Sequence, residues 1–158
     1  MSISILLVEN EQTAADMFKE ISEKVRGVKM FTAKSIVEAI EILKSKQPID
    51  VVMLDLKVHA GSEVATTRKI VDVVNHRIPV VAYFSSQPEP VKTGSSNNIY
   101  TSAMDDHELR GACSTALIVA TASARNRTKS EQKAKRMEHA LTKFSESLAS
   151  RIRAAESL

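Results

Sequence analysis

Hydrophobic residues in the first hundred positions come in short runs that are separated by amphipathic stretches. The runs have the length and the β-branched content of strands, and they cover residues 3–8, 28–33, 50–56, 78–84 and 99–103. Between the first two runs, apolar residues recur at helical spacing, at Ala14, Phe18, Ile21 and Val25. This alternation of strands and helices predicts a parallel sheet that helices cover on both faces.

The segment after the second run has the pattern of a helix start. Ser35 opens the sequence "SIVE", in which Glu38 follows three positions later. A serine followed by a glutamate at this spacing is typical of a capping box, which satisfies backbone N–H groups at the start of a helix. We therefore expect a helix to begin directly after Ser35.

The last third of the chain has a different pattern. From Asp105 to Leu158 there is no proline and a single glycine, Gly111, which predicts one long helix with a bend or break near Gly111 or Asn126. The first part of this helix is apolar enough to lie on the sheet. The second part carries a seam with spacings of 3, 4, 3, 4 and 7 residues, formed by Ala134, Met137, Leu141, Phe144, Leu148 and Ala155. Arg151 fills the one gap.

That seam has the a/d pattern of a coiled coil. A helix of this length extends about 80 Å, so most of it cannot contact a compact domain. We therefore expect the seam to pack against another helix in a homodimer. Because the chain stops within the seam, at Leu158, we also expect it to be a piece of a longer regulator.

Charge divides the chain at about the same place. The whole sequence of 158 residues is 43% hydrophobic and 26% charged, as in a globular protein with one domain of ordinary size and an appendage. Residues 1–124 carry 13 basic and 15 acidic side chains, whereas residues 125–158 carry nine basic and four acidic ones. We predict a domain over residues 1–122, and a basic linker helix with a coiled-coil segment over residues 123–158.

The single cysteine and the lack of long apolar runs exclude several classes of protein. Cys113 on its own cannot form an internal disulfide framework or a multi-cysteine metal site, and its Ala-, Leu- and Val-rich surroundings predict a buried structural thiol. The sequence has no apolar run of membrane-spanning length and no charged-then-apolar leader at its start. We expect a cytoplasmic protein with no membrane partner.

Acidic residues follow two of the predicted strands. The strand at 3–8 leads into Glu9, Asn10 and Glu11, and the run at 50–56 carries Asp55 close to its end. Open α/β sheets bind ligands at the carboxyl ends of their strands. Carboxylate oxygens there could hold Mg²⁺ and support phosphate chemistry, although the middle residue of the first cluster is an amide.

These segments resemble the receiver domain of two-component response regulators. The resemblance rests on "ILLVENE", "DVVMLDL", "IPVVAYFSS" and "HELRGACSTAL", which occur in the family's order over about residues 1–122. It implies a flavodoxin-like receiver fold, with a doubly wound parallel sheet of five strands, here followed by the long helix. It also implies a role in signal transduction, with a sensor histidine kinase or another signalling protein as the partner.

The resemblance assigns roles to individual residues. Asp55 matches the aspartate that accepts a phosphoryl group. Glu9, Asn10, Asp55 and the backbone carbonyl of Lys57 match the Mg²⁺ ligands. Mg²⁺ supplies the positive charge that a carboxylate needs when it attacks an anionic phosphate.

Other positions depart from the family pattern. Asn10 brings no charge where the family has a metal-binding carboxylate, and Ser102 replaces the lysine that holds the phosphoryl group. The family's switch residue after the fourth strand matches Phe84 or Ser85, and Ser85 and Ser102 are our candidates for the switch. Since several supports of phosphoryl transfer are altered together, we predict weak Mg²⁺ binding at most and impaired or absent phosphorylation.

Lys57 suggests a further difference. It lies two residues beyond Asp55, and its ammonium group could turn toward Asp55 and Glu9 and replace the charge of the metal ion. This hypothesis makes the pocket an electrostatic structure that holds its shape without Mg²⁺.

We therefore interpret the chain as an atypical receiver, with no catalytic residues and no enzymatic activity. It would transmit a signal through protein–protein contacts and dimerise through Met137, Leu141, Phe144 and Leu148. One alternative is a conventional phospho-accepting regulator that uses Asp55, Glu9 and Glu11 with Mg²⁺. Another is a nucleic-acid-binding regulator that uses the basic stretch 125–136, although nucleic acid is not the expected partner because aromatic residues and a recognition helix are lacking.

Overall fold

The structure is a computed structural model, and it describes residues 2–57, 63–75, 77–84, 98–102 and 105–156. Its strands are β1 (Ile3–Val8), β2 (Val28–Ala33), β3 (Val51–Asp55), β4 (Val80–Phe84) and β5 (Asn98–Ser102). Its helices are α1 (Gln12–Glu23), α2 (Ile36–Lys44), α3 (Glu63–Val74) and α4 (Asp106–Glu156). The chain divides into two compact units, Met1–Ala124 and Arg125–Leu158, and the boundary lies within α4.

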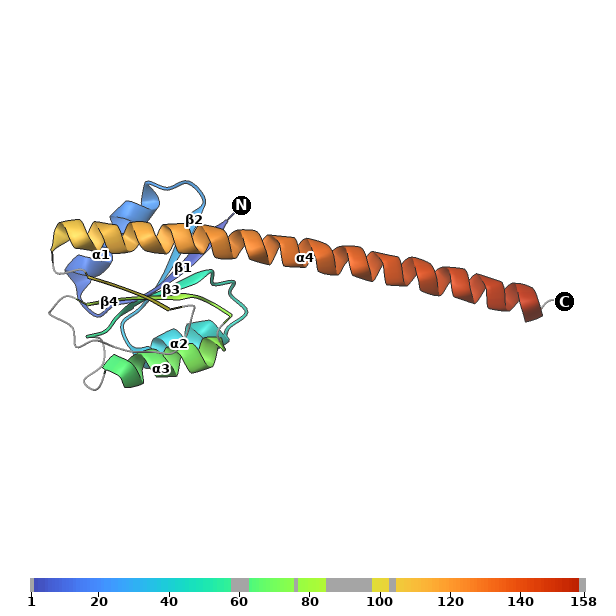
Figure 1. The fold of residues 1–158 in the computed structure, drawn as a ribbon, viewed down its shortest axis with the longest axis horizontal. Coiled ribbons are helices and arrows are strands. Elements are labelled where there is room, and N and C mark those ends of the chain that lie inside the picture. The colour runs from blue at the N-terminus through green and yellow to red at the C-terminus, as the bar shows by residue number, and fades with distance from the viewer. Residues whose placement is uncertain (1, 58–62, 76, 85–97, 103–104, 157–158) are drawn as a thin grey trace. The chain divides into compact units, whose positions relative to one another are not determined.

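The strands form one parallel sheet in the order β2-β1-β3-β4-β5 (Figure 1). Every residue of β1 and of β3 is buried, because these strands lie inside the sheet and helices cover both of its faces. The order reverses direction between β1 and β3, the neighbours from which the chain winds outward in opposite directions. In open α/β sheets this switch point is where a crevice opens at the carboxyl ends of the strands.

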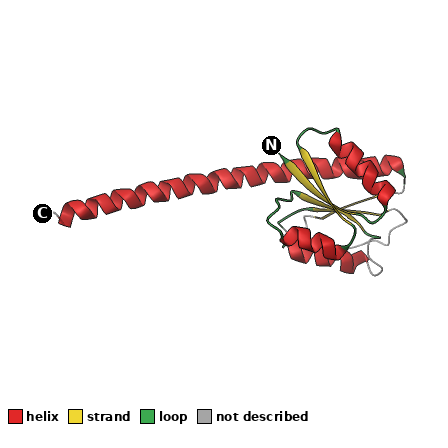
Figure 2. Cartoon of the chain, turned by 180° about the vertical axis from the view of Figure 1, so that it is seen from behind, coloured by secondary structure: helices red, strands yellow, loops and turns green. Residues whose placement is uncertain are grey.

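Helices cover the two faces of the sheet in pairs (Figure 2). On one face, Phe18 of α1 and the first part of α4 bury one cluster with the alternate residues of the strands. On the other face, Ile36 of α2 and Ile70 of α3 contribute to a second cluster. The predicted α/β fold, with a parallel sheet and a long C-terminal helix, is confirmed. So is the prediction that the first part of that helix lies on the sheet.

A row of small residues lets α4 approach the sheet closely, and it consists of Ala112, Cys113, Ala116, Ala120 and Ala124. All of them are fully buried. Burial raises the pKa of the Cys113 thiol to about 11, so the group stays protonated and unreactive at neutral pH. The prediction of a buried structural thiol is confirmed.

The start of α2 has the capping box that the sequence predicts. The Oγ of Ser35 accepts a hydrogen bond from the backbone N–H of Glu38 at 3.2 Å. The Oε2 of Glu38 accepts one from the backbone N–H of Lys34 at 2.7 Å. Two N–H groups that the helix cannot satisfy are thereby paired.

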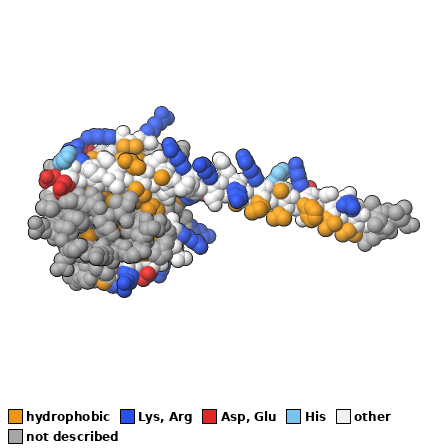
Figure 3. All heavy atoms as spheres, in the orientation of Figure 1, with side chains coloured by type: hydrophobic (Ala, Val, Ile, Leu, Met, Phe, Trp, Pro, Cys, Tyr) orange, Lys and Arg blue, Asp and Glu red, His pale blue; other side chains and the backbone are white. Residues whose placement is uncertain are grey.

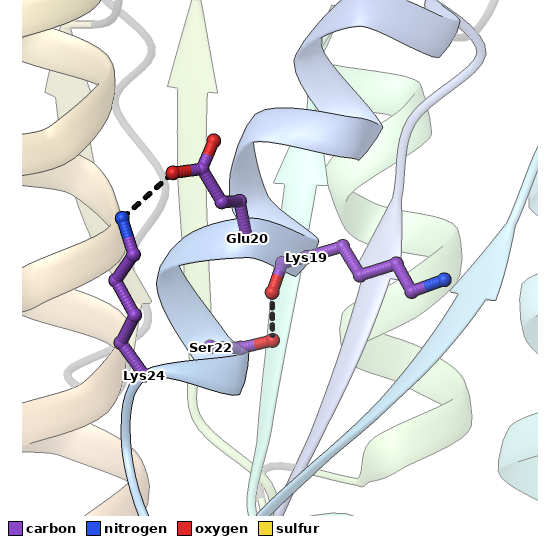
Figure 4. A network of polar contacts seen from close by, with 4 residues as sticks. All are labelled: Lys19, Glu20, Ser22 and Lys24. Carbon is purple, nitrogen blue, oxygen red and sulfur yellow. Dashed lines mark hydrogen bonds and ion pairs between the residues drawn. The ribbon is translucent and has the colours of Figure 1, made fainter.

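The end of α1 differs from the expectation. The helix ends at Glu23, so Val25, which we placed on its apolar face, lies outside it and is 37% exposed. In the last turn Ser22 donates to the carbonyl oxygen of Lys19 at 2.8 Å, and Lys24 pairs with Glu20 on the surface at 2.6 Å (Figure 4). Gly27 then takes a φ of 85°, which turns the chain toward β2 and which an L side chain rarely adopts.

The expected break in the long helix is wrong. The structure has α4 as a single helix through both Gly111 and Asn126. A glycine inside a helix costs about 1 kcal/mol relative to alanine, which is too little to interrupt a helix that is packed on a sheet. Among the described helices, none combines the length and the apolar character that a membrane crossing requires.

Candidate functional site at the carboxyl edge of the sheet

The fold brings Glu9 and Asp55 to the switch point of the sheet. Glu9 directly follows β1, and Asp55 is the last residue of the neighbouring strand β3. Asp55 lies opposite Tyr83 of β4 in the parallel register. Both carboxylates are buried, with 4% of each residue exposed. Two acids that lie far apart in the sequence thus share one enclosed edge, as the sequence predicts.

Both carboxylate oxygens of Glu9 accept hydrogen bonds from the protein. Oε1 accepts from the backbone N–H of Glu11 at 2.8 Å. Oε2 accepts from the hydroxyl of Tyr83 at 2.5 Å, in a buried contact that joins the end of β1 to β4. Hydrogen bonds to an ionised acceptor are the strong ones in proteins, and this pair fixes the orientation of the carboxylate.

The second carboxylate has an unusual protonation equilibrium. Burial raises the pKa of Asp55 to about 6, and the neighbouring carboxylate of Glu9 adds to the increase through its charge and a hydrogen bond. The backbone N–H of Lys57, which donates to Oδ1 of Asp55 at 3.0 Å, acts in the opposite direction. Asp55 therefore holds a proton more readily than an isolated carboxyl group does.

The side-chain charge of Lys57 contributes little to this balance. Its side chain is exposed, and its charge is the smallest of the influences on the pKa of Asp55, which remains raised. The ammonium group therefore does not take over the electrostatic role of a metal ion in this structure. The backbone N–H of the residue donates to Asp55, and the residue as a whole is exposed, so water screens its charge.

Tyr83 is the site residue that sequence reasoning missed. It lies in β4 within an otherwise apolar strand, and the ring is buried, with 2% of the residue exposed. Its ring packs at a tilt against Phe18 of α1, with 5.4 Å between the ring centroids. The available signal was a phenol inside a strand predicted to be buried, because a buried tyrosine hydroxyl needs a hydrogen-bond partner.

The remaining candidates are placed less completely. Asn10 and Glu11 follow Glu9 and are exposed. Ser102 ends β5, in register with Phe84, but the side chains of both residues lie outside the described part of the structure. Ser85 also lies outside the described residues. The switch roles of Ser85 and Ser102 therefore stay predictions.

The residues at this edge do not fit the Mg²⁺ ion that the resemblance implies. Mg²⁺ takes oxygen ligands in near-octahedral geometry, and in proteins it depends on one or two charged carboxylates that face it directly. Here both oxygens of Glu9 and one oxygen of Asp55 already accept hydrogen bonds, and Asn10 brings no charge. Within the described residues, no three His, Cys, Asp or Glu side chains form a group that could hold a metal ion.

Comparison with solved structures returns mostly receiver domains of response regulators. The CheY-like receiver-domain protein of Methanospirillum hungatei JF-1 has 12% identity and a TM-score of 0.61, over 80% of this chain and 99% of that one. The phosphorylated cyanobacterial phytochrome response regulator RcpA has 19% identity and a TM-score of 0.60, over 73% and 91%.

A third similar structure carries a coiled coil. It is a fusion that contains the trimeric coiled coil of yeast Spc42, with 22% identity and a TM-score of 0.59, over 91% of this chain and 96% of that one. No protein-family model matches the sequence, and no curated protein matches it either. The strand order, the paired acids at the switch point and these neighbours lead to one conclusion: the chain has the fold of a response-regulator receiver domain, extended by a long C-terminal helix.

Proposed function

We propose that this chain is an atypical receiver that transmits a signal through protein–protein contacts and dimerises through the helix of its second unit. Phosphorylation of Asp55 is impaired or absent in this proposal. The partner that delivers the signal is a sensor histidine kinase or another signalling protein, as for regulators with a receiver fold. The chain itself is not an enzyme in this account.

One observation carries the proposal, an apolar stripe along the second unit (Figure 3). It consists of Met137, Leu141, Phe144, Leu148 and Ile152, and these residues are 46% to 67% exposed. The described part of this unit, Arg125–Leu158, is a single helix, so it offers no second element of its own to cover the stripe. The first four of these residues keep the 4, 3, 4 spacing of a heptad seam, and such an exposed apolar row is typical of a helix that packs against a partner helix.

Charge placement favours a second copy of this chain in parallel orientation. With Leu141 at heptad position a, Lys133 lies at position g and Glu138 at the following position e, and both side chains are exposed. In a parallel two-stranded coiled coil, position g of one helix faces the next position e of its partner. Lys133 of each copy would thus face Glu138 of the other, and the pairing forms twice by symmetry.

The electrostatics of the first unit support the other half of the proposal. A phosphoryl group brings negative charge, and its transfer needs cations close to the accepting carboxylate. Asp55 instead lies beside a second carboxylate, and burial, with a smaller contribution from Glu9, raises the pKa of Asp55, which disfavours additional negative charge at this position. The similar regulator RcpA was solved in a phosphorylated form, so conventional phosphorylation on Asp55 is the competing function.

Sedimentation equilibrium of the intact chain tests the dimer. The expected result at micromolar concentration is a species with twice the mass of the 17.3 kDa chain. A monomer over the whole concentration range would contradict the proposal. A trimer, as in the coiled coil fused in the yeast Spc42 structure, would contradict the two-stranded arrangement.

A further inference from the structure

The hydroxyl of Tyr83 lies within hydrogen-bonding distance of the Glu9 carboxylate. The phenol donates to Oε2 at 2.5 Å, while the backbone N–H of Glu11 donates to Oε1 at 2.8 Å. Both donors come from the protein itself, and Glu9 is only 4% exposed. Each oxygen of the Glu9 carboxylate therefore already accepts one hydrogen bond from the protein.

The phenol cannot easily leave this position. The ring of Tyr83 is buried between the sheet and α1, where Phe18 packs against it with 5.4 Å between the ring centroids. A tyrosine hydroxyl carries its proton at neutral pH, and here it donates a hydrogen bond to Oε2 of Glu9. The buried ring therefore holds the hydroxyl in place as a hydrogen-bond donor to Glu9.

A divalent cation at Glu9 would have to compete with this donor. The ion would share Oε2 with the phenol, and its positive charge would repel the phenolic hydrogen that lies there. Displacement of the hydroxyl from Glu9 would leave a buried donor without its acceptor, which costs free energy. The neighbouring Asp55 offers limited compensation, since its Oδ1 accepts from the N–H of Lys57.

We propose that Tyr83 is a specificity-determining residue that acts as an internal ligand of Glu9 and excludes divalent cations from the carboxyl edge of the sheet. This inference deepens the proposed function, on which it rests for the view that the pocket works without Mg²⁺. It assigns the exclusion to one hydroxyl group, and the removal of that group should reverse it. The exclusion of cations by Tyr83 does not depend on dimerisation through the coiled coil.

Replacement of Tyr83 by phenylalanine tests the inference, because this change removes the hydroxyl and keeps the ring. Mg²⁺ alone is titrated into the full-length protein, and binding is followed by the backbone amide resonances of Glu9 and Asp55. Tyr83→Phe is expected to bind Mg²⁺ at least about tenfold more tightly than the wild type, in line with the loss of one charge-assisted hydrogen bond. Tyr100→Phe, at the only other tyrosine in the sequence, is the matched control and should bind like the wild type.

The double variant Glu9→Gln/Tyr83→Phe should lose the gain, which would locate the ion at Glu9. Equal Mg²⁺ affinity of Tyr83→Phe and the wild type would overturn the inference. Saturable submillimolar binding by the wild type would also overturn it, and that measurement does not depend on any variant folding. Sedimentation tests the dimer separately, so a monomeric chain with the predicted gain in cation affinity would contradict the proposed function and support this inference.

Discussion

A variant in which Leu141 and Phe144 are both replaced by glutamate is expected to sediment as a monomer. Both residues lie in the apolar stripe, where they are 63% and 67% exposed. Burial of one such side chain stabilises an association by about 1.5–3 kcal/mol, and a dimer would bury both from each chain. The glutamates would also place like charges in the interface, so the dissociation constant should rise at least about a hundredfold.

The control for this variant places two glutamates on the opposite side of the same helix. His139 and Ser150 are exposed and lie about half a turn away from the stripe, at outward heptad positions. His139→Glu/Ser150→Glu adds the same number of acidic side chains and should remain a dimer. Circular dichroism should show equal helix content in the two variants. If both dissociate equally, net charge rather than the stripe controls assembly.

Replacement of Asp55 by asparagine is expected to stabilise the folded chain at neutral pH. The pKa of Asp55 is raised from 3.8 to about 6, so folding favours the protonated carboxyl. The stability that the proton provides is fully present below a pH of 3.8 and is lost as the pH rises through 6. Asparagine keeps the shape and carries no charge, so we expect a gain of about 2–3 kcal/mol in the free energy of unfolding at pH 7.5.

Urea unfolding at pH 7.5 and at pH 5 measures this effect. The advantage of Asp55→Asn should shrink at the lower pH, because the wild-type carboxyl is then largely protonated. Glu11→Gln is the matched control, since Glu11 is an exposed acid close to the same edge. Its stability should differ little from that of the wild type. A pH-independent gain, or a loss of stability in Asp55→Asn at pH 7.5, would contradict the assigned electrostatics.

Much of the fold follows from local patterns in the sequence. The strand at residues 28–33 has its predicted bounds because an apolar run of that length permits few alternatives. The capping box at Ser35 was predictable because it depends on two residues that are three positions apart. The placement of Asp55 beside Glu9 followed from a general property of parallel sheets, whose strands all end at the same edge.

The decisive contact of the site could not be predicted in this way. The bond from Tyr83 to Glu9 joins residues 74 positions apart, and it requires the β1-β3-β4 order, the register of β4 and the support of Phe18. For Lys57, by contrast, the sequence suggested an electrostatic role that the structure does not show. Its place in the sequence suggested a charge over the pocket, whereas the structure shows its backbone N–H donating to Asp55 and its side-chain charge as the smallest influence on the pKa of Asp55.

The central claim is that the pocket at Glu9 and Asp55 is held by its own hydrogen bonds and that phosphorylation of Asp55 is impaired or absent. Incubation of the full-length chain with acetyl phosphate and Mg²⁺, followed by intact-mass spectrometry, measures this directly. We predict an unchanged mass. A phosphoryl adduct that forms on the wild type and is absent from Asp55→Asn would contradict the claim.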